Sequence, residues 1–335
     1  MAFPVAGSAT TPPLYPVGSP SNGLSGAGFI PEIWSGKLVE KLYASTVLAA
    51  ISNTEYEGEI QSHGDKVIIR TKPTMLIRDY KADGLLQVDR PTGAKIDLLI
   101  DKGKYFNAAV DDVMALQSDI DNLSIWAEDA SEQFKIVIDT EVLLALLDQA
   151  NTKNRGIAAG KISGDINLGA SNTPLALAKD DANVADGAVE VLDAILRLGQ
   201  VLDEQNVPET GRWLVMPAWV SSMIKRSELR QAYLTGDSVS PMRNGRIGQI
   251  DRFTLYVSNL LPSGVPACLK AGEYPLYAGH SHGLTFATQM TNMESIRSEM
   301  IFGKLLRGLQ VYGYKVIDDI AIAQAIVTKF VPVAP

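Results

Sequence analysis

The segment with the clearest potential for chemistry runs from Gly279 to Gly283 and reads Gly-His-Ser-His-Gly, the G-x-S-x-G spacing of a hydrolase nucleophile elbow. Such an elbow needs a strand before the serine, a helix after it, and a histidine farther along the chain to act as the base. Residues 284–288 (Leu-Thr-Phe-Ala-Thr) predict a strand rather than a helix, and no histidine follows His282. The sequence therefore does not favour a hydrolase.

The same segment offers a His-x-His pair, His280 and His282, which would face one side of a strand and could bind a metal ion. Zinc sites use three or four ligands, and the chain has only one further histidine, His63, and one cysteine, Cys268. The glycines of residues 18–28 follow no strand and precede no Gly-Lys-Ser/Thr, so they do not predict a phosphate-binding loop. We expect no catalytic residues, no cofactor, no metal and hence no enzyme.

The element that dominates the chain is a run of 52 residues, Lys104–Arg155, without a glycine or a proline. The run predicts one amphipathic helix over residues 111–150, about 60 Å long, which would be the spine of an extended subunit. Glu141 interrupts its apolar side, and together with residues 136–138 it marks where the helix would bend or end early. The apolar residues recur at steps of three and four: Val113, Leu116, Ile120, Leu123, Ala127, Ala130, Phe134, Val137 and Leu144.

Nearly all of the net charge lies on this predicted helix. Residues 111–150 hold ten acids and one base, Lys135, for a net charge of −9, whereas the whole chain carries −8. The acids are either a solvated face or a face that meets basic surface on a neighbouring subunit, with Glu128, Asp129 and Glu132 as the candidates. An acidic helix does not bind nucleic acid, because binding requires Lys and Arg to neutralise phosphates.

The N-terminal residues 1–28 are uncharged and rich in proline and glycine. They predict either a disordered tail or an arm that orders only against another subunit. The first charge is Glu32, so we expect no secretory signal, and no apolar run approaches the roughly 18 residues of a membrane span. A helix is predicted from Pro31 to Ser52.

Residues 55–104 predict a long, charged β-hairpin with strands at 66–72 and 95–101. A two-stranded ribbon has little core of its own, so the hairpin must contact something else. We expect its basic side chains to meet acidic surface on adjacent subunits, with the long helix as the candidate surface. These side chains are Lys66, Arg70, Lys72, Arg78, Lys81 and Arg90.

The remainder alternates between short helices and strands, which predicts an α/β module followed by returning strands. Helices are predicted at 184–206 and 217–226, and strands at 213–216, 254–258, 274–278 and 284–288. Three final strands, at 295–302, 309–317 and 320–327, are expected to pack back against the long helix.

The order of these elements resembles that of the major capsid proteins of tailed bacteriophages with the Hong Kong 97-type fold. Four segments strengthen the resemblance, which covers residues 29–330: Phe29–Leu38 (FIPEIWSGKL), Gly58–Arg70 (GEIQSHGDKVIIR), Arg212–Pro217 (RWLVMP) and Gly248–Ser258 (GQIDRFTLYVS).

The resemblance implies an α+β fold with an N-arm, an E-loop hairpin, a P-domain built on the spine helix, and an A-domain. It implies that Arg243 and Arg246, in a polar loop of the A-domain, contact neighbours at capsomer axes. We expect no covalent cross-link, because the required lysine, asparagine and acid cannot be matched. The implied boundaries are 1–54 for the N-arm and first helix, 55–104 for the E-loop, 105–184 for the P-domain with spine helix 111–150, 185–290 for the A-domain, and 291–335 for the P-domain strands and C-terminus.

The function implied is a structural protein that self-assembles through hexamers and pentamers into an icosahedral shell. Inside the virion that shell would enclose double-stranded DNA without sequence-specific binding, after assembly in the host cytoplasm. The implied partners are a scaffolding protein, a portal protein and a decoration or cement protein, with no membrane. The alternative is an encapsulin-type nanocompartment shell protein of the same fold.

Overall fold

The computed structural model describes residues 43–55, 66–73, 75–79, 88–112, 122–178, 187–227, 248–265, 269–299 and 301–330. All of them belong to one compact unit. The predicted arm at 1–28, Lys81, and both Arg243 and Arg246 lie outside the described residues. Within the described ranges, no helix is both long and apolar enough to cross a membrane.

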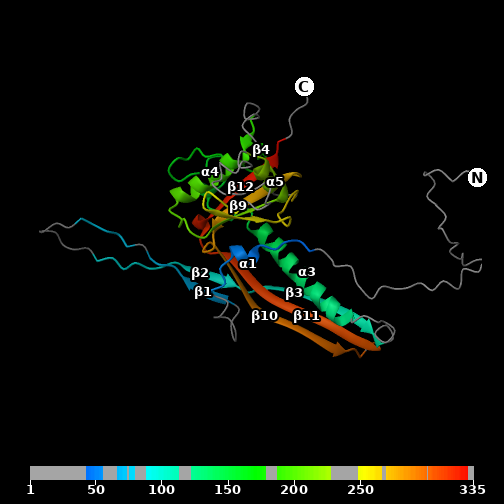
Figure 1. Ribbon diagram of the computed structural model, residues 1–335. Helices are drawn as coiled ribbons and strands as arrows, with labels where there is room; N and C mark the ends of the chain where they lie inside the picture. Colours follow the sequence, from blue (N-terminus) through cyan, green and yellow to red (C-terminus); the bar gives the residue numbers. More distant parts are fainter. Residues whose placement is uncertain are drawn as a thin grey trace, which may run out of the picture. The chain divides into compact units, whose positions relative to one another are not determined.

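A seven-stranded mixed sheet forms the larger part of the unit (Figure 1). Its strands, in spatial order, are β5 (Val189–Glu190), β4 (Leu175–Ala178), β12 (Ile322–Lys329), β9 (Glu273–His280), β6 (Arg212–Met216), β8 (Phe253–Val257) and β7 (Gln249–Ile250). The strand predicted at 320–327 is therefore β12, in the interior of this sheet. The sequence places this strand against the long helix together with the strands predicted at 295–302 and 309–317. In the structure β12 instead lies between β4 and β9 in the seven-stranded sheet, and its first residue, Ile322, shares a core with the last turns of the long helix.

Both faces of this sheet are covered, which explains why every residue of β6 is buried. Leu214 and Met216 face a core formed with α4 (Val191–Glu204) and α5 (Ala218–Arg226). Trp213 and Val215 face the opposite core. The helix predicted at 217–226 is confirmed with Pro217 as its N-cap, and the helix predicted at 184–206 is confirmed with a later start.

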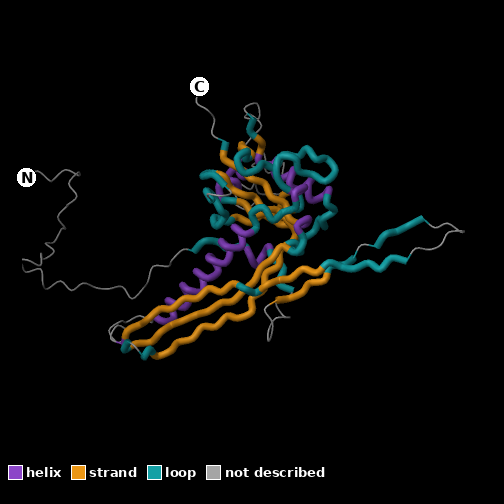
Figure 2. Tube along the Cα trace, turned by 180° about the vertical axis from the view of Figure 1, so that it is seen from behind, coloured by secondary structure: helices purple, strands orange, loops and turns teal. Residues whose placement is uncertain are grey.

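The second sheet is antiparallel and three-stranded, in the order β10 (Leu284–Arg297), β11 (Gly303–Val316) and β3 (Lys102–Asp111). Helix α3 (Asn122–Ala145) runs along one face of it (Figure 2). Phe106 of β3 meets Phe134 of α3 with ring centroids 5.5 Å apart. The strand predicted at 284–288 is confirmed as the first part of β10. The prediction of a separate strand at 295–302 is wrong, because β10 runs as one strand to Arg297 and the next strand begins at Gly303.

The predicted helix bounds of 111–150 are also wrong. Asp111 is the last residue of β3, α3 ends at Ala145, and residues 113–121 lie outside the described part. The 24 residues of α3 extend about 36 Å. The helix continues unbroken through residues 136–138 and Glu141. A stretch free of glycine and proline favours any regular structure, and residues 104–111 pair with β11 instead.

The apolar side of α3 changes partners along its length. Val137 and Leu144, predicted to be buried, are 44% and 42% exposed. Ile138, Val142 and Leu146 are buried instead, in the core that holds Trp213 and Tyr277 of the seven-stranded sheet. Leu284 and Tyr312 of the three-stranded sheet belong to the same core, so the last turns of the helix meet both sheets and one regular stripe does not describe the helix.

The predicted hairpin is confirmed by β1 (Lys66–Arg70), which pairs antiparallel with β2 (Lys95–Leu99). Val67, Ile69 and Leu98 form a small core with Ala287 of β10. The described end of the predicted helix 31–52 is α1 (Leu48–Ile51), and residues 43–47 are not helical. The described residues also contain two single-turn 3₁₀ helices, Thr152–Asn154 and Asp319–Ala321.

The end of α3 is capped by a side chain from the seven-stranded sheet. The Tyr277 hydroxyl donates a hydrogen bond to the carbonyl of Leu143 at 2.9 Å. The carbonyl of the preceding residue, Val142, accepts a hydrogen bond from the Leu146 amide. The carbonyls of the last helical turn lack amide partners within the helix, so the tyrosine satisfies one of them inside the core.

Replacing Tyr277 with Phe is expected to lower the free energy of unfolding by about 1–2 kcal/mol, because the buried carbonyl of Leu143 loses its donor while the ring packing is kept. Urea denaturation of the purified subunit measures this. The matched control is Tyr274→Phe on the same strand, which is partly exposed and should change stability less. Equal losses from both variants would contradict the capping role.

Candidate intersubunit interface

Beyond the paired strands β1 and β2, the hairpin continues as an extension that we call the hairpin arm, residues 71–73, 75–79 and 88–94 (Figure 1). The apolar side chains of Ile77 and Val88 are each 87% exposed, and Met75 and Leu76 are also exposed. Single apolar residues on a surface are ordinary, but several together on a segment without a core indicate an interaction surface. The hairpin arm therefore presents apolar side chains that the described part of the chain leaves uncovered.

The two sides of the hairpin arm are joined near its base and near its outer end. At the base, the Thr71 amide and hydroxyl both donate to the carbonyl of Ala94, at 3.0 and 2.9 Å. Farther out, Arg78 Nη2 lies 3.0 Å from Asp89 Oδ2. These links hold the exposed residues in one arrangement before a partner binds, which lowers the entropy cost of binding.

The basic side chains predicted for the interface divide into two groups. Lys66 lies 3.9 Å from Asp97 and Arg78 is paired with Asp89, so these two have partners inside the hairpin. The others that the structure describes are exposed and form no ion pair with any described residue: Arg70, Lys72 and Arg90.

Arg78 either joins the two sides of the hairpin arm or contacts another subunit, and swapping the charges of Arg78 and Asp89 distinguishes these two roles. If its role is to join the two sides of the hairpin arm, Arg78→Glu should reduce particle yield and the double variant Arg78→Glu/Asp89→Arg should restore it. The subunit's own stability should change by no more than about 1 kcal/mol, since the pair is exposed. Particle yield by sedimentation is the measurement. A double variant as defective as the single one would show that Arg78 contacts another subunit instead.

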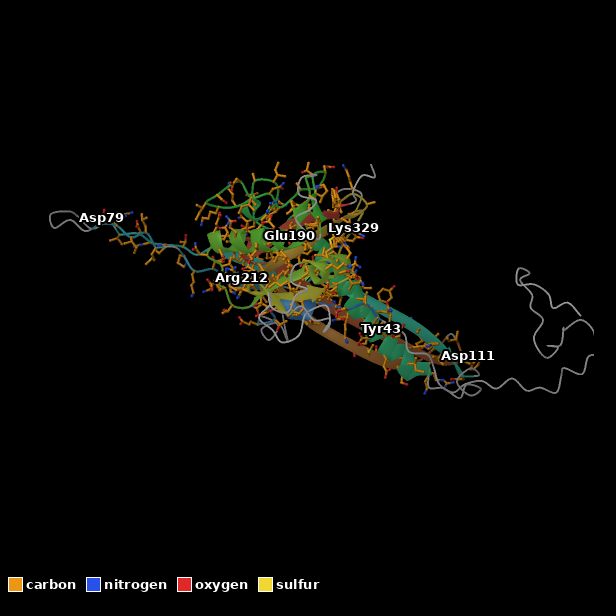
Figure 3. The ribbon with its side chains drawn as sticks, turned by 45° about the horizontal axis from the view of Figure 1, so that its top comes forward. Tyr43, Asp79, Asp111, Glu190, Arg212 and Lys329 are labelled. Carbon is orange, nitrogen blue, oxygen red and sulfur yellow. The ribbon has the colours of Figure 1, made fainter. Side chains whose placement is uncertain are left out.

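The acidic side chains predicted for the interface lie on the first half of α3. Asp129 accepts a hydrogen bond from the Tyr43 hydroxyl at 2.8 Å, which raises the pKa of that tyrosine (Figure 3). Glu132 is paired with Lys135 at 2.6 Å, and Glu128 is exposed with no ion pair among described residues. No ion pair joins this acidic group to the described bases of the hairpin, so their contact between subunits stays a prediction.

Glu141, which the sequence marks as an interruption, lies at the centre of a polar cluster between α3 and the three-stranded sheet. Its carboxylate oxygens are 2.9 Å from Lys102 Nζ and 2.8 Å from Lys104 Nζ. The Tyr312 hydroxyl donates to Oε2 at 2.9 Å, and Lys102 Nζ lies 4.6 Å from the centre of the Tyr314 ring. The cluster therefore joins the helix to two neighbouring strands.

The electrostatics of this cluster favour the charged forms. Burial raises the pKa of Glu141, but the hydrogen bonds from Lys104, Lys102 and Tyr312 outweigh burial and lower the pKa to about 2. The hydrogen bonds to Tyr314 and Glu141 raise the pKa of Lys102. The sequence analysis did not predict this cluster. A signal for it was present, because Lys102 and Lys104 are two residues apart on their strand, as are Tyr312 and Tyr314, and residues two apart lie on the same face of a strand.

The histidine-containing segment 279–283 connects strands of the two sheets. β9 ends at His280 and β10 begins at Leu284, which confirms the strand predicted after the serine and rules out a nucleophile elbow. The His282 amide donates to His280 Nδ1 at 3.1 Å, and burial lowers the pKa of His280. The described residues contain no group of three potential metal ligands.

Comparison with known proteins gives a consistent result. Residues 96–325 match the family model described as phage capsid protein, whereas no curated protein sequence matches the chain. A solved structure from Mycobacterium phage Che8 is similar with 26% identity and a TM-score of 0.68, covering 88% of this chain and 96% of that one. The capsid structure of Cyanophage P-SCSP1u is similar at 13% identity and a TM-score of 0.70, covering 94% and 98%. The mature capsid of bacteriophage PhiM1 is similar at 15% identity and a TM-score of 0.62, covering 90% and 92%.

Proposed function

Because the chain belongs to the phage capsid protein family, we propose that it assembles through hexamers and pentamers into an icosahedral shell around the double-stranded DNA of a tailed phage. It is a structural capsid protein with an α+β fold of the Hong Kong 97 type, a component of the virion and not an enzyme. The route of assembly and the contents of the shell belong to the proposal.

The exposed apolar surface of the hairpin arm carries this proposal. Ile77 and Val88 are almost wholly exposed, and burying a side chain of this size stabilises an interface by about 1.5–3 kcal/mol. In a closed symmetric assembly, each subunit offers the same surface to an equivalent neighbour, so every hairpin arm is covered. The bases Arg70, Lys72 and Arg90 would meet acids such as Glu128 across that contact.

The proposed domains follow the elements of the fold. The hairpin of β1 and β2 with its arm would be the E-loop within 55–104, and residues 1–54 the N-arm and first helix. The three-stranded sheet with α3 would be the P-domain, and the seven-stranded sheet with α4 and α5 the A-domain. Since β12 pairs with β9 and β4, we now place residues 322–329 in the A-domain rather than with the P-domain strands.

The proposed partners complete the particle. They are a scaffolding protein, a portal protein at one vertex, and a decoration or cement protein, with assembly in the host cytoplasm. The match to a phage capsid family favours this viral shell over the encapsulin alternative.

Expression of the full chain, alone and with a candidate scaffolding protein, tests the proposal. Light scattering and negative-stain electron microscopy are expected to show capsomers and closed shells. A chain that stays monomeric with and without scaffolding protein at assembly concentrations would overturn it. Nuclease-protected double-stranded DNA inside particles purified from infected cells would support the viral shell, whereas packaged enzymes would support the encapsulin alternative.

Deleting residues 1–28, which lie outside the described part, tests whether this segment is a dispensable tail or an arm that assembly requires. We expect the shortened subunit to stay soluble but to give at least tenfold fewer particles than the full chain, since it loses contacts that only neighbours provide. Sedimentation of equal amounts of both proteins measures this. Normal particles from the shortened chain would show that the segment is a dispensable tail.

A further inference from the structure

The far end of the three-stranded sheet carries an exposed aromatic side chain. β10 ends at Arg297, β11 begins at Gly303, and β3 ends at Asp111, which lies at this end of the sheet in Figure 3. In the connection between β10 and β11, Phe302 is 86% exposed and Ile301 beside it is also exposed. We call residues 301 and 302 the sheet tip.

The backbone holds the sheet tip in a defined position. The carbonyl of Phe302 accepts a hydrogen bond from the Asp112 amide at 2.9 Å, and Ser298 donates its amide to the carbonyl of Gly303 at 3.0 Å. Arg297 and Asp112 form an ion pair of 2.8 Å across the same end. A side chain at Gly303 would collide with the carbonyl of Val110, so glycine lets the two strands approach closely. The backbone that carries the phenyl ring is therefore fixed at this end of the sheet.

The face of this sheet opposite α3 contains a hollow of 390 Å³. Cavities of about 300–1,000 Å³ suit small ligands, so this one has room for an aromatic ring. Tyr105, which is 79% exposed, lines it together with Leu309 and two amides, Asn107 and Asn292. Glu294 and Arg307 form an ion pair of 2.6 Å at its edge. The hollow is therefore lined by apolar, amide and charged side chains together, the kinds of group that meet at protein interfaces.

We propose that Phe302 of one subunit inserts into this hollow on the neighbouring subunit. The inference rests on the proposed shell, in which copies of this sheet meet. Each of the two surfaces carries one basic and one acidic side chain, Arg297 with Asp112 beside the sheet tip and Arg307 with Glu294 in the hollow. Docking can therefore set Arg297 against Glu294 and Asp112 against Arg307, so that the inserted ring lies between charges of opposite sign.

The contact is heterologous, since the two patches differ, and in a closed shell such a contact forms a ring around a symmetry axis. Asn107, in the hollow, lies four residue steps along β3 from Asp111, which is at the same end of the sheet as the sheet tip. Neighbouring sheets would therefore overlap by about 14 Å. Contact between two sheet tips, or coverage of Phe302 by residues 113–121 of its own chain, would be different arrangements that the test distinguishes.

Cross-linking in assembled particles tests the inserted ring. In a Cys268→Ser background, Phe302→Cys, Asn107→Cys and the double variant are treated with a short bismaleimide. We expect a ladder of covalent multimers from the double variant and almost none from either single variant. Dimers from Phe302→Cys alone would indicate contact between sheet tips and overturn the inference, as would the absence of a ladder in intact particles.

A second pair of variants tests the same contact if the variants with introduced cysteines do not assemble. Phe302→Ala should reduce particle yield at least tenfold without changing the Tm of the subunit, whereas Ile162→Ala, at a comparably exposed residue (82%) outside this sheet, should leave yield unchanged. A lowered subunit Tm for Phe302→Ala, or normal yield, would overturn the inference. Particles of the unaltered chain are examined first, because their absence would contradict the proposed shell itself and not this contact.

Discussion

Replacing Ile77 with Asp is expected to abolish particle formation while leaving the fold of the subunit intact. The side chain is 87% exposed, so the subunit itself loses no packing. In the shell, the substitution removes about 1.5–3 kcal/mol of apolar burial from every contact and adds the cost of burying a charge without a partner. A loss of about 4 kcal/mol corresponds to roughly a thousandfold weaker contact, repeated at every equivalent interface.

The measurement is the fraction of protein sedimenting as particles, together with the thermal denaturation of the unassembled subunit. Ile77→Leu is the matched control, because it keeps the apolar volume at the same position and should assemble normally. Val88→Asp, on the other side of the hairpin arm, should reproduce the defect. Particles in normal yield from Ile77→Asp would show that this part of the hairpin arm stays uncovered in the shell.

Replacing Glu141 with Gln is expected to have the largest effect on the stability of the subunit. Two lysines, Lys102 and Lys104, and the Tyr312 hydroxyl all converge on this one carboxylate. Without its charge, the two ammonium groups repel each other at the surface of a core. We expect a loss of about 1–3 kcal/mol, below the value for a fully buried pair because both lysine side chains are more than a third exposed.

The pH dependence gives this prediction a definite sign. The pKa of Glu141 is lowered from its ordinary value of 4.5 to about 2 in the folded chain, so its carboxylate stabilises the fold above pH 4.5. That contribution decreases as the pH falls from 4.5 towards 2. The difference in unfolding free energy between the native chain and Glu141→Gln should therefore be constant near neutrality and decrease below pH 4.5.

Glu132→Gln provides the matched control on the same helix. Its ion pair with Lys135 is exposed and local, so its loss should cost no more than about 0.5 kcal/mol. Denaturant titration of the three proteins at pH 7 and at several acidic values separates them. Equal stability of Glu141→Gln and Glu132→Gln at pH 7 would contradict a structural role for the cluster.

Features of the fold that depend on neighbouring residues could be predicted from the sequence. The alternation in β1 and β2, and the proline that begins α5, define strands and helices through local geometry alone. The end of β3 at Asp111 could not be predicted in this way. Residues 104–111 have no glycine or proline to separate them from the helix, and only pairing with β11, about 200 residues later in the chain, makes them a strand.

The candidate site shows the same limit more clearly. In the sequence, Glu141 is recognisable only as a polar residue on the otherwise apolar side of a predicted helix. Its partners lie 39 residues earlier in β3 and 171 residues later in β11. Periodicity contains no information about such distant contacts. The hairpin arm could be predicted because its lack of a core follows from its own length and charge, but its contacts belong to the assembly and not to one chain.

The way in which α3 ends has a mechanical consequence. Its last turns lie inside the core of the seven-stranded sheet, where Tyr277 caps them, while its first half lies on the three-stranded sheet. The helix is therefore a stiff connection between the two sheets. A load applied at the outer end of the small sheet is carried along a stiff rod into the larger core, and is not absorbed by a hinge. The Glu141 cluster additionally joins the helix to β3 and β11. A shell built from this chain would therefore distribute internal pressure over both sheets.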